Sequence, residues 1–279
     1  MNATVFTGDL RWSSIADGAL NSAARIWFIV AVSGQALFAL YVAVSYGSTA
    51  ATGDFAKWGR FLTVGIVPGD TMGNLALAAH LLLAVIVTVC GPLQLIANIR
   101  ARAPAFHRWN GRVYLAGVVT TAVAGLYMEN ARNHIPSVVM QVGGSLNAVL
   151  ILLCAAMALR YALARDIKTH RQWALRLFLV VSASWFFRVI LMFWIAINGG
   201  PVGFDPRTFM GPATDIMSFA QYLLPLAVLE IYFRAQGSTG SATRLATAGG
   251  LVLLTVAMGL GMFVAFKAFW LGPILRAVA

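Results

Sequence analysis

The stretch Ile26–Tyr46, IWFIVAVSGQALFALYVAVSY, contains no charged side chain. At about 1.5 Å of rise per residue, a helix of this length crosses the roughly 30 Å of hydrocarbon in a bilayer. The stretch is too long for the core of a cleavable signal peptide, and Asp9 and Asp17 precede it. We therefore interpret it as the first membrane-spanning helix of the chain.

The composition extends this interpretation to the whole chain. Of the 279 residues, 60% are hydrophobic and 10% are charged, whereas soluble domains average about 45–50% apolar and about 25% charged residues. No stretch is both polar and long enough to form a soluble domain. The composition predicts a single all-α, polytopic membrane domain over residues 1–279.

Seven apolar runs are separated by short polar or basic connections, which predicts about seven transmembrane helices. Pro92 is expected to kink the second run near its end. The third run is short and is expected to borrow length from residues 107–112 and from Glu129-Asn130. Trp270 and Lys267 are expected to anchor the last run at a membrane interface. The predicted spans are Ile26–Tyr46, Leu75–Ile99, Val113–Met128, Pro136–Leu159, Leu177–Ile197, Ile216–Phe233 and Ala248–Phe266.

The formal net charge of +11 comes from basic residues that cluster between the apolar runs. In a soluble protein this charge would suggest nucleic-acid binding, but here it is the topology signal of membrane insertion, and no nucleic-acid partner is expected. With the N-terminus inside, thirteen Lys and Arg residues fall in cytoplasmic segments and six in outer segments. This distribution predicts that the N-terminus lies inside.

Two basic motifs lie where apolar runs begin. The first is His107-Arg108-Trp109-Asn110-Gly111-Arg112-Val113-Tyr114. The second, His170-Arg171-Gln172-Trp173, repeats the His-Arg pair and the nearby Trp. In the predicted topology both motifs lie at the inner face, at the starts of the third and fifth spans. His80 lies in the outer part of the second span, and His134 lies at the outer end before the fourth.

This alternation of histidines is similar in architecture to the di-haem transmembrane b cytochromes. On that pattern His80 would pair with His134, and His107 with His170, because a haem iron is bound by neutral imidazoles. The alternative is that the inner histidines are interfacial residues that shape two basic turns. No other metal site is indicated, since the two cysteines form no C-x-x-C pair. The cations expected to neutralise the haem propionates are Arg108, Arg112, Arg171 and Arg176.

Two charged residues lie inside predicted spans. Placing Arg188 in hydrocarbon costs about 2.5–3.5 kcal/mol, so it is expected to face the bundle interior with Glu129, Asp215 or a bound anion as its partner. The alternative is that its long stem snorkels to the outer interface. Glu230, near the inner end of the sixth span, is expected either to pair with Arg171, Arg176 or His107 or to be an interfacial carboxylate.

Together these features resemble a family of uncharacterised bacterial multi-pass membrane proteins known only as a domain of unknown function. The signatures are His80 followed by Gly91-Pro92-Leu93-Gln94, the HRxxGRxY motif that begins at His107, and the DxKxHRxWxxR motif that begins at Asp166. The resemblance covers the five central spans, residues 75–233, which the spans 26–46 and 248–266 flank. It implies a bacterial inner-membrane location but no particular activity.

Three functions fit these residues. The first is a redox subunit that binds a b-type haem or a quinone through the histidines. The second is a transporter or receptor for a small anion or a lipid that uses Arg188. The third is a non-catalytic subunit or scaffold whose basic turns hold a partner protein, a second copy of the chain or anionic lipid. The chain has no P-loop, G-x-G-x-x-G, H-E-x-x-H or G-x-S-x-G motif, so whether it is an enzyme is left open.

Overall fold

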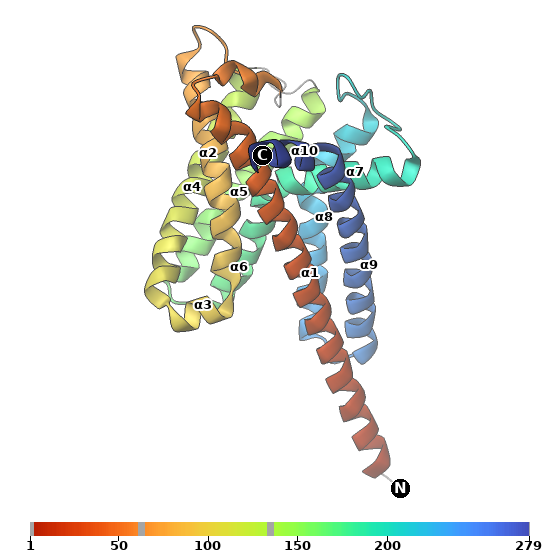
Figure 1. The fold of residues 1–279 in the computed structure, drawn as a ribbon. Helices are drawn as coiled ribbons and strands as arrows, with labels where there is room; N and C mark the ends of the chain where they lie inside the picture. Colours follow the sequence, from red (N-terminus) through yellow and green to blue (C-terminus); the bar gives the residue numbers. More distant parts are fainter. Residues whose placement is uncertain (1–2, 61–64, 133–136, 279) are drawn as a thin grey trace.

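The computed structural model describes residues 3–60, 65–132 and 137–278, and these residues are almost entirely helical, without a strand (Figure 1). This confirms the predicted all-α fold. The elements are α1 (Ala3–Ala51), η1 (Phe55–Arg60), α2 (Thr71–Leu95), α3 (Ala97–Arg102), α4 (Pro104–Ala131), α5 (Val138–Leu163), α6 (Ile167–Val181), α7 (Ala183–Asn198), α8 (Pro212–Gly237), α9 (Ser241–Ala265), η2 (Phe266–Trp270) and α10 (Leu271–Val278).

The membrane spans agree with the predicted number when one bent pair is counted as one span. Within the described residues, six helices or continuous helical segments are each long and apolar enough to cross a membrane. Helices α6 and α7 pass the same test together but are bent by 55° at the break between them. The fifth apolar run is therefore part of a bent pair of helices that begins at Ile167, and not the single helix expected from Leu177 to Ile197.

The bend between α6 and α7 has a local cause and a distant support. The Ser182 hydroxyl at the junction donates to the carbonyl oxygen of Phe178, one turn earlier, at 2.7 Å. Such a bond competes with the helix ladder and favours bending. The same hydroxyl accepts a hydrogen bond of 2.9 Å from Nε2 of Gln35 on α1, a side chain that is only 2% exposed. Helix α1 thus supports the bend through a hydrogen bond to the junction between α6 and α7.

Helix boundaries also differ from the predicted runs at the basic end of the bundle. Helix α2 continues through Pro92 to Leu95, and the extended backbone of Ile96 separates it from α3. Helix α4 begins at Pro104, because proline at the first helical position gives up no required donor. Residues 107–112 are therefore early turns of α4, and the third span borrows its length from them as expected.

Helices α2, α4, α5 and α6 form the central bundle, which lies on the left in Figure 1. Helix α2 packs on α4, α4 on α5, α5 on α6, and α6 again on α2. The four helices therefore close a ring in which α4 and α6 lie across from each other. Its interior is filled by buried side chains that include Val87, Val118, Leu177 and Val180.

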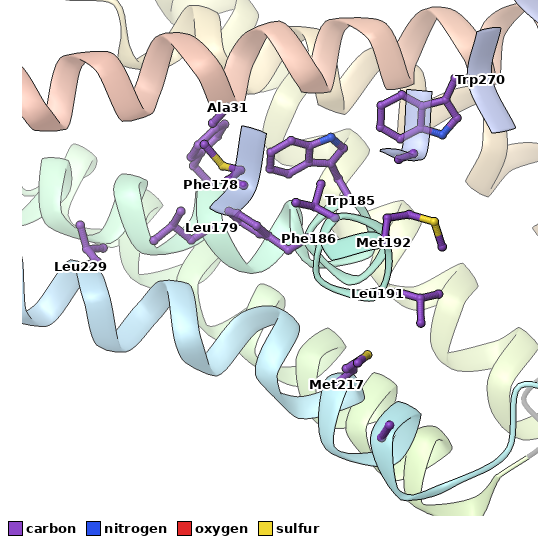
Figure 2. Packing of buried hydrophobic residues seen from close by; sticks show 14 of the residues in the cluster. Ala31, Phe178, Leu179, Trp185, Phe186, Leu191, Met192, Met217, Leu229 and Trp270 are labelled. Carbon is purple, nitrogen blue, oxygen red and sulfur yellow. The ribbon is translucent and has the colours of Figure 1, made fainter. Parts of the chain in front are cut away.

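A second layer, α1 with α7, α8 and α9, packs beside this central bundle. Arg244 near the start of α9 holds the N-terminal part of α1, since its Nη1 lies 3.0 Å from Asp17 Oδ1. The largest apolar core of the described residues joins the two layers. Figure 2 shows Phe178, Trp185 and Phe186 gathered beside α1, close to Ala31.

The C-terminal end departs from the expected interfacial anchor. Trp270 is only 2% exposed and packs its ring against Phe38 and Tyr41 of α1, at centroid distances of 5.6 and 6.4 Å. The π-helical turn η2 brings the indole back onto the protein before α10 begins. Trp270 is therefore a core residue, and the expectation that it anchors the span at the membrane surface was wrong.

Candidate functional site

One face of α4 directs His107 and Asn110 of the first His-Arg motif toward the interior of the central bundle, while Arg108 and Trp109 are exposed. Asn110, Tyr114 and Val118 are buried and follow His107 at intervals of three, seven and eleven residues, which is the spacing of one helical face. Nδ2 of Asn110 donates to the carbonyl oxygen of Cys90 on α2 at 3.0 Å. His107 is thus the first member of the inward-facing row of α4.

The second motif is arranged in the same way on α6. His170 is followed on one face by Trp173, Leu177 and Val180, which belong to the interior of the central bundle. The helix begins after Asp166, whose side chain accepts from the backbone N–H of Thr169 at 3.1 Å. Hydrogen bonding by Thr169, first through its side chain and then through its backbone N–H, holds the pKa of the Asp166 carboxyl below its usual value.

The two motifs meet at the basic end of the bundle. Helices α4 and α6 lie across the ring, and the charge of the His170 imidazole acts on that of His107, although the burial of the His107 ring has a larger effect on it. Nδ1 of His170 lies 2.9 Å from the carbonyl oxygen of Ala158 on α5, which fits an Nδ1–H donor. Nδ1 of His107 is buried and has no hydrogen-bond partner among the described residues.

The arginines of the two motifs have different environments. Arg108, together with Arg100 at the end of α3, interacts electrostatically with the His107 ring. The Arg112 guanidinium instead stacks on Trp109 at 4.8 Å from the ring centroid. Arg171 lines a cavity on the other side of α6. Of the arginines expected near the inner histidines, Arg108 is therefore the one that acts on His107, and Arg100 is an addition that sequence reasoning missed.

Glu230 forms one of the ion pairs expected from the sequence. Its Oε1 accepts from Nε of Arg176 at 2.8 Å and lies 2.7 Å from Nη2 of the same guanidinium. Arg176 also lies over the rings of Trp173 and Phe233, at 4.9 and 5.4 Å from their centroids. The arginine charge is thus already balanced by a carboxylate that joins α6 to α8.

Arg188 does not contact the carboxylates that were expected as its partners. Its Nη1 donates to the backbone oxygen and the hydroxyl of Ser184, at 2.6 and 2.8 Å, and the guanidinium lies 5.0 Å from the centroid of Phe38. None of the ion pairs formed by the described residues includes it. The expected carboxylates bond elsewhere, Glu129 with Ser145 at 3.3 Å and Asp215 with Ser137 at 2.7 Å.

His80 lies at the other end of the central bundle. Its Nδ1 is 3.1 Å from the carbonyl oxygen of Thr121, and its ring lies beside Gly125, so the side chain is directed at the neighbouring helix α4. His134, the expected partner of His80, lies outside the described residues. Among those residues no group of three or more His, Cys, Asp or Glu side chains could hold a metal ion by itself.

Asn110 and Arg100 are the site residues that sequence reasoning missed. Asn110 lies three residues after His107, a spacing that already indicated a shared helical face. Arg100 gave no such signal, because its approach to His107 depends on the short helix α3 that follows the break at Ile96.

These features define a multi-pass helical membrane protein whose two His-Arg motifs lie at the same end of its central bundle. The model of the family described as "Predicted membrane protein (DUF2306)" matches residues 77–232, more than half of the chain, and the protein belongs to that family. The matched segment begins in α2, ends in α8 and contains both His-Arg motifs. No curated protein and no solved structure matches the chain.

Proposed function

We propose that the protein is a membrane redox protein that binds one b-type haem between His107 and His170. The observation that carries the proposal is the placement of these two histidines at the start of the inward-facing rows of α4 and α6, opposite each other in the central bundle. Two imidazoles on facing helices are the arrangement in which a helix bundle can hold a haem iron from both sides.

The hydrogen bonding of His170 suits an axial ligand. Histidines that bind a metal usually donate their second ring N–H to a carbonyl or carboxylate, which fixes the tautomer and the ring orientation. Ala158 supplies such a carbonyl 2.9 Å from His170 Nδ1. His107 has a buried ring nitrogen without a partner among the described residues, which a ligand in this part of the bundle would explain.

Charge around the pair fits an anionic group at this end of the bundle. Arg100 and Arg108 interact with the His107 ring, and guanidinium groups bind carboxylates such as haem propionates by paired hydrogen bonds. Arg176 is a weaker candidate for this role because Glu230 already neutralises it. When bound, the haem would supply one-electron transfer, while the arginines and the apolar interior would tune its reduction potential.

We restrict the proposal to this inner pair. His80 is directed at the backbone of α4, and its expected partner lies outside the described residues. The anion or lipid receptor centred on Arg188 has less support, since that side chain is engaged by Ser184 and Phe38. We further propose that the basic end faces the cytoplasm of a bacterial inner membrane, because thirteen of the Lys and Arg residues fall on that side.

An absorption spectrum of detergent-purified protein from haem-replete cells tests the proposal. A Soret band and one haem per chain are expected, with the band lost in His107→Ala and in His170→Ala but retained in His80→Ala. Unfolding temperatures of the three variants would show that the bundle still folds. A well-folded wild-type protein without a Soret band would contradict the proposal, and so would equal bands in all the variants.

A further inference from the structure

A cavity of about 750 Å³ lies between the two layers of the fold, outside the histidine pair. It is lined by residues of α1, α6, α7, α8 and α9, with one residue of α2 at its edge, and it is partly open to the surroundings. Its volume falls within the roughly 300–1,000 Å³ that is typical of ligand-binding cavities. Phe178, Leu179, Phe186 and Leu229 border it, and Figure 2 shows them between α1 and α8.

The polar side chains of the cavity gather at the basic end of the protein. Arg171 lies in the first two turns of α6, and Tyr232 and Gln236 lie in the last turns of α8. Nε2 of Gln236 donates to the Tyr232 hydroxyl at 2.8 Å, and Arg171 interacts electrostatically with the same tyrosine. Arg25 contributes a second cation from α1.

The far end of the cavity is apolar and aromatic. Helix α7 is bent away from α6 by 55°, and its residues Val189, Ile190, Phe193 and Trp194 line the cavity at that end. The cavity is therefore amphipathic, with two guanidinium groups at one end and hydrocarbon side chains along the rest of its length.

Neither guanidinium at this end is balanced by a carboxylate among the described residues. Glu230 is bound to Arg176, and Asp17 is bound to Arg244, while none of the ion pairs includes Arg25 or Arg171. Two unbalanced guanidiniums from different helices favour an anion that can accept several hydrogen bonds, as a phosphate does.

We propose that this cavity binds a phosphate-headed lipid, with its phosphate at Arg25 and Arg171 and an apolar chain inside the protein. An acyl chain gains little by leaving the bilayer for an equally apolar cavity, because lipid tails are as apolar as leucine. Recognition must therefore come mainly from the headgroup charge, and binding depends on the two arginines. The site is separate from the proposed haem, since Arg171 and His170 face different sides of α6.

Thermal-shift titrations of the full-length protein in a neutral detergent test this site. The probes are dioleoyl phosphatidylglycerol, dioleoyl phosphatidylcholine with the same chains, a neutral polyprenyl quinone and inorganic phosphate. Phosphatidylglycerol is expected to stabilise the protein most, and its apparent affinity is expected to fall at least tenfold in the Arg25→Gln, Arg171→Gln double variant. Arg234→Gln removes one positive charge at the end of α8, away from the cavity lining; it is the control for loss of charge alone and is expected to bind as wild type.

A second variant tests the chain-binding part without removing charge. Ala257→Phe places a ring in the cavity lining and is expected to weaken phosphatidylglycerol binding while both arginines remain. Equal shifts with phosphatidylglycerol and phosphatidylcholine would overturn the proposal. Undiminished phosphatidylglycerol binding by the double variant would also overturn it. So would a thermal shift with inorganic phosphate alone that equals the shift with phosphatidylglycerol, or a shift with the quinone that exceeds it.

Discussion

His170 and Arg171 are consecutive in sequence, yet the His170 ring bonds to Ala158 inside the central bundle and the Arg171 side chain lines the cavity of the second layer. Successive residues of an α-helix point about 100° apart. The regular geometry of a helix thus lets one His-Arg pair face two separate sites, one for each proposed ligand.

This division predicts opposite effects of two neighbouring substitutions. His170→Ala is expected to abolish the Soret band and to leave phosphatidylglycerol stabilisation unchanged, because the arginine remains in the cavity. Arg171→Gln is expected to keep the band and to lower lipid affinity severalfold. Spectra and thermal shifts measured on the same preparations check both effects. If each substitution impaired both ligands equally, the two sites would not be separate.

A glycine on α9 is predicted to control the packing of α9 on α7. A Cβ at Gly261 would collide with the backbone carbonyl oxygen of Val189, which cannot move as a flexible side chain could. Gly261→Ala is therefore expected to destabilise the fold by about 1–3 kcal/mol. At Gly259, on the same helix, an added Cβ would meet no atom within 4 Å, so Gly259→Ala is expected to be neutral or stabilising by up to about 1 kcal/mol. Unfolding in detergent compares the two, and equal effects would refute the packing argument.

The hydrogen bond between Gln35 and Ser182 is predicted to stabilise the bend of the fifth span. Because Gln35 is buried and its Nε2 lies 2.9 Å from the Ser182 hydroxyl, Gln35→Leu is expected to cost about 1 kcal/mol. Ser182→Ala should have a similar cost, and the double variant should cost less than the sum of the two. A double-mutant cycle on unfolding free energies measures this coupling. Strictly additive costs would mean that the bond contributes nothing to the bend.

The N-cap of α6 is predicted to make stability depend on pH. The folded-state pKa of Asp166 is depressed by its hydrogen bonds to Thr169, so the ionised carboxylate stabilises the fold above the unfolded pKa of about 3.9, and this contribution is lost as the pH falls through the depressed value. Asp166→Asn keeps a capping oxygen but cannot titrate. The difference in unfolding temperature between wild type and Asp166→Asn should therefore shrink between about pH 6 and about pH 3.

Asp166→Ala provides the comparison for the cap itself. It removes the acceptor for the Thr169 N–H and is expected to lower the unfolding temperature at every pH. A wild-type and Asp166→Asn difference that stayed constant with pH would show that the ionised form of this carboxyl does not contribute to stability.

The membrane fold could be predicted from the sequence because most spans are continuous apolar runs. Such a run can be recognised from its own residues, without knowing which helices pack against it. The break at Ser182 could not, since it depends on Gln35, which is 147 residues away in sequence. The burial of Trp270 could not be predicted for the same reason. In the sequence it resembles an interfacial anchor, but it packs against Phe38 and Tyr41, which are distant in the sequence.

The candidate site was only partly predictable. The positions of His107 and His170 at the starts of their apolar runs indicated that both lie at one end of the bundle, and the candidates for Glu230 included its actual partner, Arg176. The cavity is formed by helices spread from α1 to α9, so no local pattern could reveal it. For Arg188, the expectation of a carboxylate partner overlooked Ser184, one turn earlier on its own helix.

The 55° bend also changes how far Arg188 lies from the end of α7, measured along the axis of α6. Along a straight span, the ten residues from Arg188 to the end of α7 would rise roughly 15 Å, whereas along the oblique limb they rise only roughly 9 Å measured on the axis of α6. A long arginine side chain can reach across much of that distance. The tilt of α7 thus shortens the distance, measured along the axis of α6, between the Arg188 guanidinium and the loop that follows α7.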